Sequence, residues 1–176
     1  MGGASTAKQP HAADGCTAAS EGQVRWETGA PHPTFTVVAP ALRMAAGAIA
    51  GRTVALGDAS LIVGELPRGD ASVALVALDG LPLDRSKEML LVSEARVENT
   101  RMVFNAQRTG LTSWGRGPAL AEYVPLTVTL GGAPLRAERL DPAGRSAGEI
   151  PVVQDANGRS VLRLEHEPSL WFRLRR

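Results

Sequence analysis

Short apolar runs rich in β-branched side chains recur along most of this chain, and they constrain its fold more than any other feature. Gly, Pro, Asp and Asn separate the runs, so that turns return roughly every 8 to 12 residues. Only residues 41–50 could form a helix, and Gly47 and Gly51 disfavour one there. The pattern predicts an all-β fold, an antiparallel β-sandwich of jelly-roll or immunoglobulin-like type with about ten strands. We expect those strands within residues 23–28, 34–40, 52–57, 60–66, 71–80, 88–97, 126–132, 134–145, 149–159 and 160–176.

Turn chemistry supports this assignment. The sequence "LDGLPLDRSK" contains Gly80 and Pro82, which suit a turn and not a strand interior, so residues 71–80 and 88–97 are expected to form a hairpin. Nearer the C-terminus, "DPAG" and "DANG" are typical turn sequences. They predict a meander of antiparallel strands.

The first 22 residues differ in character from the rest. They are rich in Ala, Gly, Ser and Thr and lack the charged start and apolar core of a signal peptide, so we expect a flexible leader over 1–22 and a β-sandwich domain over 23–176. No run reaches the roughly 18 apolar residues of a membrane span, which predicts a soluble chain without membrane contact. The compartment stays open: cytoplasmic, or periplasmic or extracellular if the chain is part of a secreted hydrolase.

Composition removes several classes of function. The formal net charge is +1 with both signs interspersed, so no basic patch indicates nucleic acid as a partner. Cys16 is the single cysteine and cannot form an internal disulfide or a cysteine-based zinc site. The histidines at 11, 32 and 166 are scattered, and no phosphate-binding or dinucleotide motif is present. We therefore expect neither a metal nor a cofactor.

Two of the expected strands are apolar on both faces, although a strand with one wet face should alternate. They are residues 73–78, "VALVAL", and residues 89–92. Central strands with small residues toward water would explain this pattern. A sheet face that docks on another domain or on a second copy of the chain would explain it equally well.

The stretch "ARVENTRMVFNAQRTGLTSWGRGP", residues 95–118, is the least regular part of the domain. Its amide and guanidinium groups can bond sugar hydroxyls, and its tryptophan offers a flat apolar face for a pyranose ring. The favoured interpretation is a structured crossover corner with Trp114 in the core, because Asn and Thr commonly close loops through their own backbone. A carbohydrate site is the alternative, and its candidate residues here are Asn99, Arg101, Asn105, Arg108 and Trp114.

The last expected strand, "SLWFRLRR", alternates between two faces. Leu170, Phe172 and Leu174 share one face and should belong to the core. Trp171 lies on the other face beside Arg173, where it could form a cation–π pair, a docking contact or a sugar platform. Trp171 therefore joins the candidate carbohydrate-binding residues.

Catalysis would require two suitably spaced carboxyl groups, about 5 Å apart for a retaining glycosidase and about 6.5 to 9.5 Å for an inverting one. Glu94 and Glu98 share a face if residues 88–98 form one strand, but they would lie about 13 Å apart at about 3.3 Å per residue. Arg96 falls between them, which favours a charge ladder over catalysis. Further candidates on other strands are Glu65, Asp79, Glu122 and Glu149.

The residues over 23–174 resemble a known module. The sequences "SVALVALDGLPLDRSKEMLLVSEARVENTRMVFN" and "WGRGPALAEYVPLTVTL" are similar to the C-terminal β-sandwich accessory module of bacterial cellulase-like glycoside hydrolases. In that group the hydrolytic carboxylates belong to a catalytic barrel, which is absent here. The chain departs from the pattern at two places. It has Arg101 where the group has Gly, and it has "VVAPAL", residues 37–42, where the group has an acidic residue before Thr-Pro-Arg.

Three functions follow from the residues and the resemblance together. The first is a carbohydrate-associated module of a glycoside hydrolase system that binds polysaccharide or oligosaccharide, or supports a catalytic domain, without catalysis of its own. The second is a small stand-alone hydrolase of β-glycosides, with Glu94, Glu98 and Glu122 as candidate catalytic residues. The third is a structural domain that dimerises through its apolar sheet face.

Overall fold

A computed structural model describes residues 16–19, 23–29 and 31–176, and within these ranges it contains strands and turns but no helix. The all-β prediction is confirmed, and residues 41–50 contain a strand where a helix was the alternative. The strands outnumber the roughly ten expected because turns and bulges divide several runs. Their bounds are β1 (Cys16–Ala19), β2 (Val24–Glu27), β3 (Thr34–Ala39), β4 (Leu42–Gly47), β5 (Thr53–Leu56), β6 (Ala59–Val63), β7 (Ala71–Ala77), β8 (Glu88–Glu94), β9 (Val97–Thr100), β10 (Val103–Phe104), β11 (Leu111–Ser113), β12 (Arg116–Ala121), β13 (Leu126–Leu130), β14 (Arg136–Leu140), β15 (Ser146–Ile150), β16 (Val152–Gln154), β17 (Ser160–Arg163) and β18 (Trp171–Arg175).

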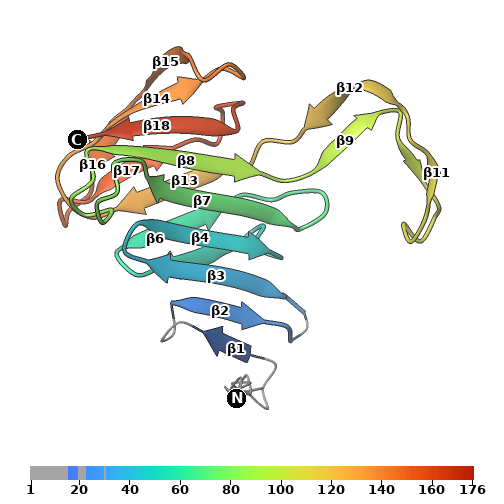
Figure 1. The fold of residues 1–176 in the computed structure, drawn as a ribbon, viewed down its shortest axis with the longest axis horizontal. Helices are drawn as coiled ribbons and strands as arrows, with labels where there is room; N and C mark the ends of the chain where they lie inside the picture. Colours follow the sequence, from blue (N-terminus) through green and yellow to red (C-terminus); the bar gives the residue numbers. More distant parts are fainter. Residues whose placement is uncertain (1–15, 20–22, 30) are drawn as a thin grey trace, which may run out of the picture.

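Two antiparallel sheets form the body of the protein (Figure 1). The larger sheet has the order β1-β2-β3-β4-β7-β8-β18-β14-β15, and the smaller one has the order β16-β17-β13-β6-β5. One of the passages from the larger to the smaller sheet is at Pro151, which separates β15 from β16. Most of the predicted leader, 1–22, lies outside the described residues, and its described part pairs as β1 with β2.

The core lies between the sheets because their strands alternate between apolar and polar side chains. Val73 and Leu75 of β7 point inward from the larger sheet. Leu126, Val128 and Leu130 of β13 point inward from the smaller sheet, and each of the three is at most 1% exposed. Burying an aliphatic side chain of this size stabilises the fold by about 1.5–3 kcal/mol. The period-two pattern thus accounts directly for the two-layer architecture.

The predicted turns are present. Asp141 accepts hydrogen bonds from the backbone N–H groups of Ala143 and Arg145 at 2.8 and 2.9 Å. Asp155 caps the β16–β17 turn in the same way, with Arg159 N–H at 2.9 Å. Backbone hydrogen bonds from Arg145 and Arg159 are the main cause that lowers the pKa of the two carboxyl groups. The hairpin of β7 and β8 also forms as predicted.

One cross-strand row on the outer face of the larger sheet is entirely apolar. It runs over β3, β4, β7, β8 and β18, and all of its members except the buried first one are partly exposed. Residues 73–77 and 89–92 lie in the central strands β7 and β8, which was one of the two explanations for their pattern. The row consists of Val37, Met44, Ala74, Val92 and Trp171.

Strands β9 to β12, residues 97–121, form an arm that extends away from the sandwich (Figure 1). In this arm β9 pairs with β12, and β10 pairs with β11. The backbone of Ala95 and Arg96 pairs with Glu122 at 3.0 and 2.8 Å and closes the base of the arm. The favoured interpretation of a structured crossover is confirmed, because this segment connects β8 of the larger sheet to β13 of the smaller one, but its expected packing on the core is wrong (Figure 1). Residues 88–98 are two strands separated at Ala95 and Arg96, and the second strand leaves the sheet.

Candidate functional site

The two halves of the arm are joined by side chains that the sequence had suggested for sugar binding. Asn99 donates through Nδ2 to the Trp114 carbonyl at 3.0 Å, and Thr100 donates through Oγ1 to the Pro118 carbonyl at 2.8 Å. Gly115 lies directly against the Thr100 backbone, with φ +67°, and any side chain there would collide with it. Asn99 is thus engaged in holding the arm together.

Asn105 is engaged in the turn at the end of the arm. Its Oδ1 accepts hydrogen bonds from the N–H groups of Thr109 and Gly110 at 2.9 and 3.3 Å, and its Nδ2 donates to Thr109 Oγ1 at 3.0 Å. These bonds satisfy the amide within the loop. Asn105 therefore shapes the turn and is not free to receive a ligand.

Glu98 is the centre of an ion-pair cluster on the arm. Arg108 Nη2 lies 2.9 Å from Glu98 Oε1, Arg68 also bonds that oxygen, and Arg96 Nη1 lies 3.9 Å from Oε2. The Arg108 guanidinium stacks over the Phe104 ring at 4.2 Å. Glu98 and Arg108 are therefore both occupied by structural contacts.

Two of the sugar contacts predicted on the arm remain available. Trp114 is 75% exposed, so the expectation that it belongs to the core is wrong. Arg101 is exposed, has φ 60°, and makes no hydrogen bond or ion pair within the described part of the chain. Among the sugar contacts predicted on the arm, Trp114 and Arg101 are the ones with free binding capacity.

The candidate catalytic carboxylates do not form a pair. Glu94 ends β8 and is exposed, whereas Glu98 and Glu122 lie beyond the break between β8 and β9. Arg96 separates those two, with its guanidinium 3.9 Å from Glu98 Oε2 and 3.7 Å from Glu122 Oε2. The guanidinium occupies the space between the two carboxylates, so they do not face one glycosidic bond as a glycosidase pair must.

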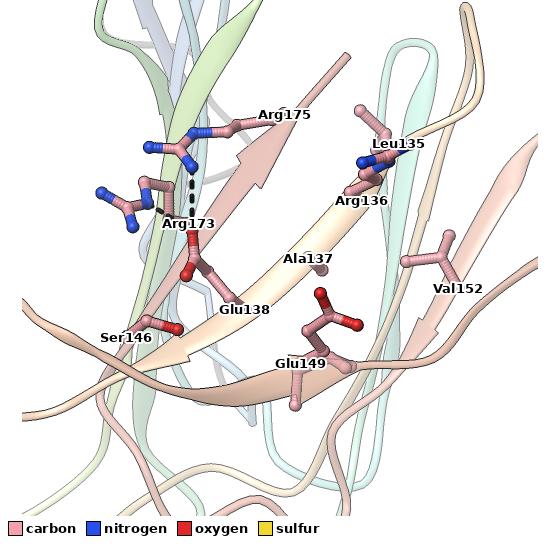
Figure 2. Close-up of a pocket in the computed structure, with 10 residues that line it drawn as sticks. Leu135, Arg136, Ala137, Glu138, Ser146, Glu149, Val152, Arg173 and Arg175 are labelled. Atoms are coloured by element: carbon pink, nitrogen blue, oxygen red, sulfur yellow. Dashed lines mark hydrogen bonds and ion pairs between the residues drawn. The ribbon is translucent and has the colours of Figure 1, made fainter.

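A different pair of acids lines a cleft on β14 and β15, shown in Figure 2. Glu138 and Glu149 are direct cross-strand partners. Figure 2 shows Glu138 directed toward Arg173 and Arg175, whose nitrogen atoms lie 2.6 and 3.3 Å from its Oε1, with Glu149 outside that ion pair. The predicted cation–π contact of Arg173 with Trp171 is thus replaced by an ion pair. Glu149 is exposed, so the cleft lacks a buried acid that could protonate a leaving group.

The lowered pKa of Glu138 determines how the ion pair contributes to folding stability at different pH values. Hydrogen bonds from Arg173 and Ser146, with the charges of Arg173 and Arg175, lower the pKa of Glu138 to about 2 from the ordinary 4.5. Because the pKa is lower in the folded state, the ion pair stabilises fully above about pH 4.5, and the gain is lost as pH falls toward 2. We expect Glu138→Gln to be less stable than the wild type by about 1 kcal/mol at pH 7. In urea unfolding series, the difference should disappear near pH 2; a constant difference would contradict the assignment.

A groove lies at the base of the arm. Trp171 and Tyr123 line it together with Arg139, Asp141 and Ser169, and its volume is about 650 Å³. That volume is within the ~300–1,000 Å³ of small-ligand sites. We call it the aromatic groove. Its polar and aromatic lining can contact both the ring face and the hydroxyl groups of a sugar.

Local hydrogen bonds position the side chains of the aromatic groove. Ser169 Oγ accepts from Trp171 N–H at 3.1 Å and donates to the Leu140 carbonyl at 2.9 Å, which joins β18 to the end of β14. Arg139 donates to the Ala147 carbonyl at 2.9 Å and lies 3.3 Å from Glu167. The Tyr123 hydroxyl has no hydrogen-bond partner among the described residues. The groove is thus largely prearranged.

Sequence reasoning identified Trp171 but missed the residues around it. Tyr123 follows the arm, Arg139 lies in β14, and Asp141 was interpreted as a turn residue only. The order β8-β18-β14 brings these distant segments together. A local pattern contains no signal for such a grouping.

Comparison with protein-family models, curated proteins and solved structures gave no match. The described ranges contain no group of three or more His, Cys, Asp or Glu side chains arranged to hold a metal ion. The described residues also contain no helix that is long and apolar enough to cross a membrane.

Proposed function

We propose that this chain is a non-catalytic carbohydrate-binding module of a glycoside hydrolase system, which holds a polysaccharide against the aromatic groove. The observation that carries this proposal is the presence of Tyr123 and Trp171 in one groove with Arg139 and Asp141. A pyranose presents a C–H face that packs on an aromatic ring and hydroxyl groups that can bond the Tyr123 hydroxyl, which has no internal partner among the described residues. The resemblance to accessory modules of cellulase-like hydrolases agrees with this function.

The arrangement of the acids supports binding over hydrolysis. The Glu98 and Glu122 carboxylates have a guanidinium between them, and Glu138 is held ionised by Arg173 and Arg175. The usual glycosidase mechanism requires one protonated and one ionised carboxyl group facing the same bond. We therefore place the catalytic step, where one occurs, outside these residues.

A binding panel tests the proposal. We expect the protein to be retained on at least one insoluble or gel-embedded polysaccharide and to release no chromophore from aryl β-glycosides. Trp171→Ala should weaken retention by about tenfold or more, which corresponds to ~1.4 kcal/mol. Trp26→Ala is the matched control, because Trp26 is 54% exposed on β2, near the opposite edge of the larger sheet.

The outcomes separate the alternatives. If Trp171→Ala and Trp26→Ala lost polysaccharide retention equally, a binding site in the aromatic groove would be contradicted. Release of the chromophore would favour the hydrolase, and Glu138→Gln, Glu122→Gln and Glu98→Gln would then identify its carboxylates. Absence of binding to every polysaccharide tested would remove the carbohydrate function.

A second candidate, a structural domain that dimerises, is favoured by the apolar row of Val37, Met44, Ala74, Val92 and Trp171. Two copies related by a twofold axis could pack this face on itself, since sheets stack about 10 Å apart. Sedimentation equilibrium distinguishes this candidate. A dimer that dissociates on Met44→Glu would support it, and a monomer at all concentrations would remove it.

A further inference from the structure

Arg101 occupies a backbone conformation that suits glycine. Its φ of 60° is in the left-handed region, where a side chain is disfavoured and glycine is not. The conformation is imposed by the arm: Met102 N–H bonds the Asn99 carbonyl at 3.0 Å, and Gly115 lies against the backbone of 100–102. An arginine at this position is less favourable than a glycine, so its side chain is the feature to explain.

Arg108 provides an internal comparison, because it is the other non-glycine residue with positive φ in the described chain, at 55°. Its guanidinium is explained by the bond to Glu98 at 2.9 Å and by stacking on Phe104 at 4.2 Å. The Arg101 guanidinium has no such partner among the described residues. Internal contacts therefore explain the arginine at position 108. They do not explain the arginine at position 101, and a bound ligand would.

The charge around Arg101 is not neutralised by its neighbours. Arg101 lines a groove on the arm with Arg96, Asn99, Glu98 and Glu122. Arg68, Arg96 and Arg108 surround Glu98, and Arg96 also lies 3.7 Å from Glu122. Arginines thus outnumber carboxylates in this cluster, and Arg101 is the one without an ion pair. An incoming anion would find a guanidinium that no internal carboxylate competes for.

The backbone of the exposed Trp114 lies close to the turn that holds Arg101. Gly115 is packed on residues 100–102, so the flanking Trp114 and Arg116 lie beside the turn that holds Arg101. Trp114 is 75% exposed, and Arg116 is exposed without an ion pair in the described chain. A flat apolar side chain and two free guanidinium groups carried by neighbouring backbone segments suit a sugar ring that carries a carboxylate or a sulfate.

We propose that the arm binds acidic polysaccharide, with Arg101 and Arg116 contacting the anionic group of a sugar whose ring packs on Trp114. This inference rests on the proposed function and specifies the class of its ligand. The aromatic groove holds one part of the sugar chain, and the arm selects for negative charge. The shared chemistry is an anionic sugar, whether the charge comes from a uronate or from a sulfate ester.

The test uses Arg101→Gly, which removes the guanidinium and suits the backbone. Affinity for polygalacturonate, alginate, dextran sulfate and neutral dextran is measured by isothermal titration at low and at physiological salt. We expect Arg101→Gly to melt at the same or a higher temperature than the wild type, and to bind the preferred acidic polymer at least tenfold more weakly. Binding of any neutral glucan should not change. Comparison of the uronate polymers with dextran sulfate identifies the anionic group.

Arg85→Ala is the control for loss of a positive charge, because the Arg85 side chain is 77% exposed in the connection between β7 and β8, away from the arm. The inference is overturned if Arg101→Gly binds acidic polymers as tightly as the wild type, or if Arg85→Ala loses as much affinity. Equal affinity for a single-stranded oligonucleotide would also overturn it, since the arm would then be a general polyanion surface. Binding of neutral glucans alone would overturn this inference and leave the carbohydrate function standing, whereas no binding at all would remove both.

Discussion

Phe172→Ala is expected to lower the free energy of unfolding by about 4 kcal/mol, a typical value for truncation of a core phenylalanine. Phe172 lies in β18 between β8 and β14 and is 1% exposed. Removing its ring leaves a cavity between the two sheets and also removes apolar burial from water. Urea unfolding followed by intrinsic fluorescence gives the difference directly.

Trp171→Ala is the matched control, because Trp171 is the preceding residue of the same strand and faces the other side of the sheet. Its side chain is half-buried, so we expect a loss of less than about 1.5 kcal/mol, below the range for core aromatics. If the two variants lost equal stability, the orientation of β18 would be contradicted. The same Trp171 variant weakens polysaccharide retention, so its small effect on stability also separates binding from unfolding.

Arg176→Met is expected to destabilise the protein by about 3 kcal/mol, because buried carbonyl groups lose a charged donor. The Arg176 guanidinium donates to the carbonyls of Leu83 and Ser86 at 2.6 and 3.1 Å, and to that of Gly131 at 2.8 Å. It thereby joins the β7–β8 connection to the β13–β14 connection. Burial lowers the pKa of Arg176, which agrees with a guanidinium held mainly by carbonyl oxygens and not by a carboxylate. Methionine keeps the apolar stem and removes the donors.

Arg175→Met serves as the control for Arg176→Met. Arg175 is exposed and pairs with Glu88 at 3.4 Å and Glu138 at 3.3 Å, so its loss should change stability by about 1 kcal/mol or less. Thermal and urea unfolding of the two variants would be compared at the same pH. An equal effect would mean that the hydrogen bonds of Arg176 to the two connections contribute little.

The arm illustrates where sequence reasoning reached its limit. The residues of 95–118 were correctly identified as unusual, and the amide roles of Asn99 and Asn105 in closing a loop agree with the structure. The exposure of Trp114 was not foreseen, because a local sequence does not say whether a β-hairpin folds back on the core or extends from it. That direction depends on the break at Ala95 and Arg96 and on their pairing with Glu122.

The aromatic groove shows the same limit for a site. Trp171 was a candidate because the residues of its strand alternate between the core face and the outer face. Tyr123, Arg139 and Asp141 line the same groove but are far from Trp171 in sequence. Their grouping follows from β18 inserting between β8 and β14. The resemblance to a hydrolase accessory module and the carbohydrate function stay predictions, which the binding experiments decide.

The sequence by itself determined the all-β sandwich, the central hairpin of β7 and β8 and the turns at Asp141 and Asp155, because side-chain alternation and turn chemistry are properties of neighbouring residues. Only the tertiary structure decided the strand order, the extension of the arm and the grouping of Tyr123 with Trp171. These features depend on contacts between distant segments, whose free energies are set by how the whole sheet packs and not by any local period.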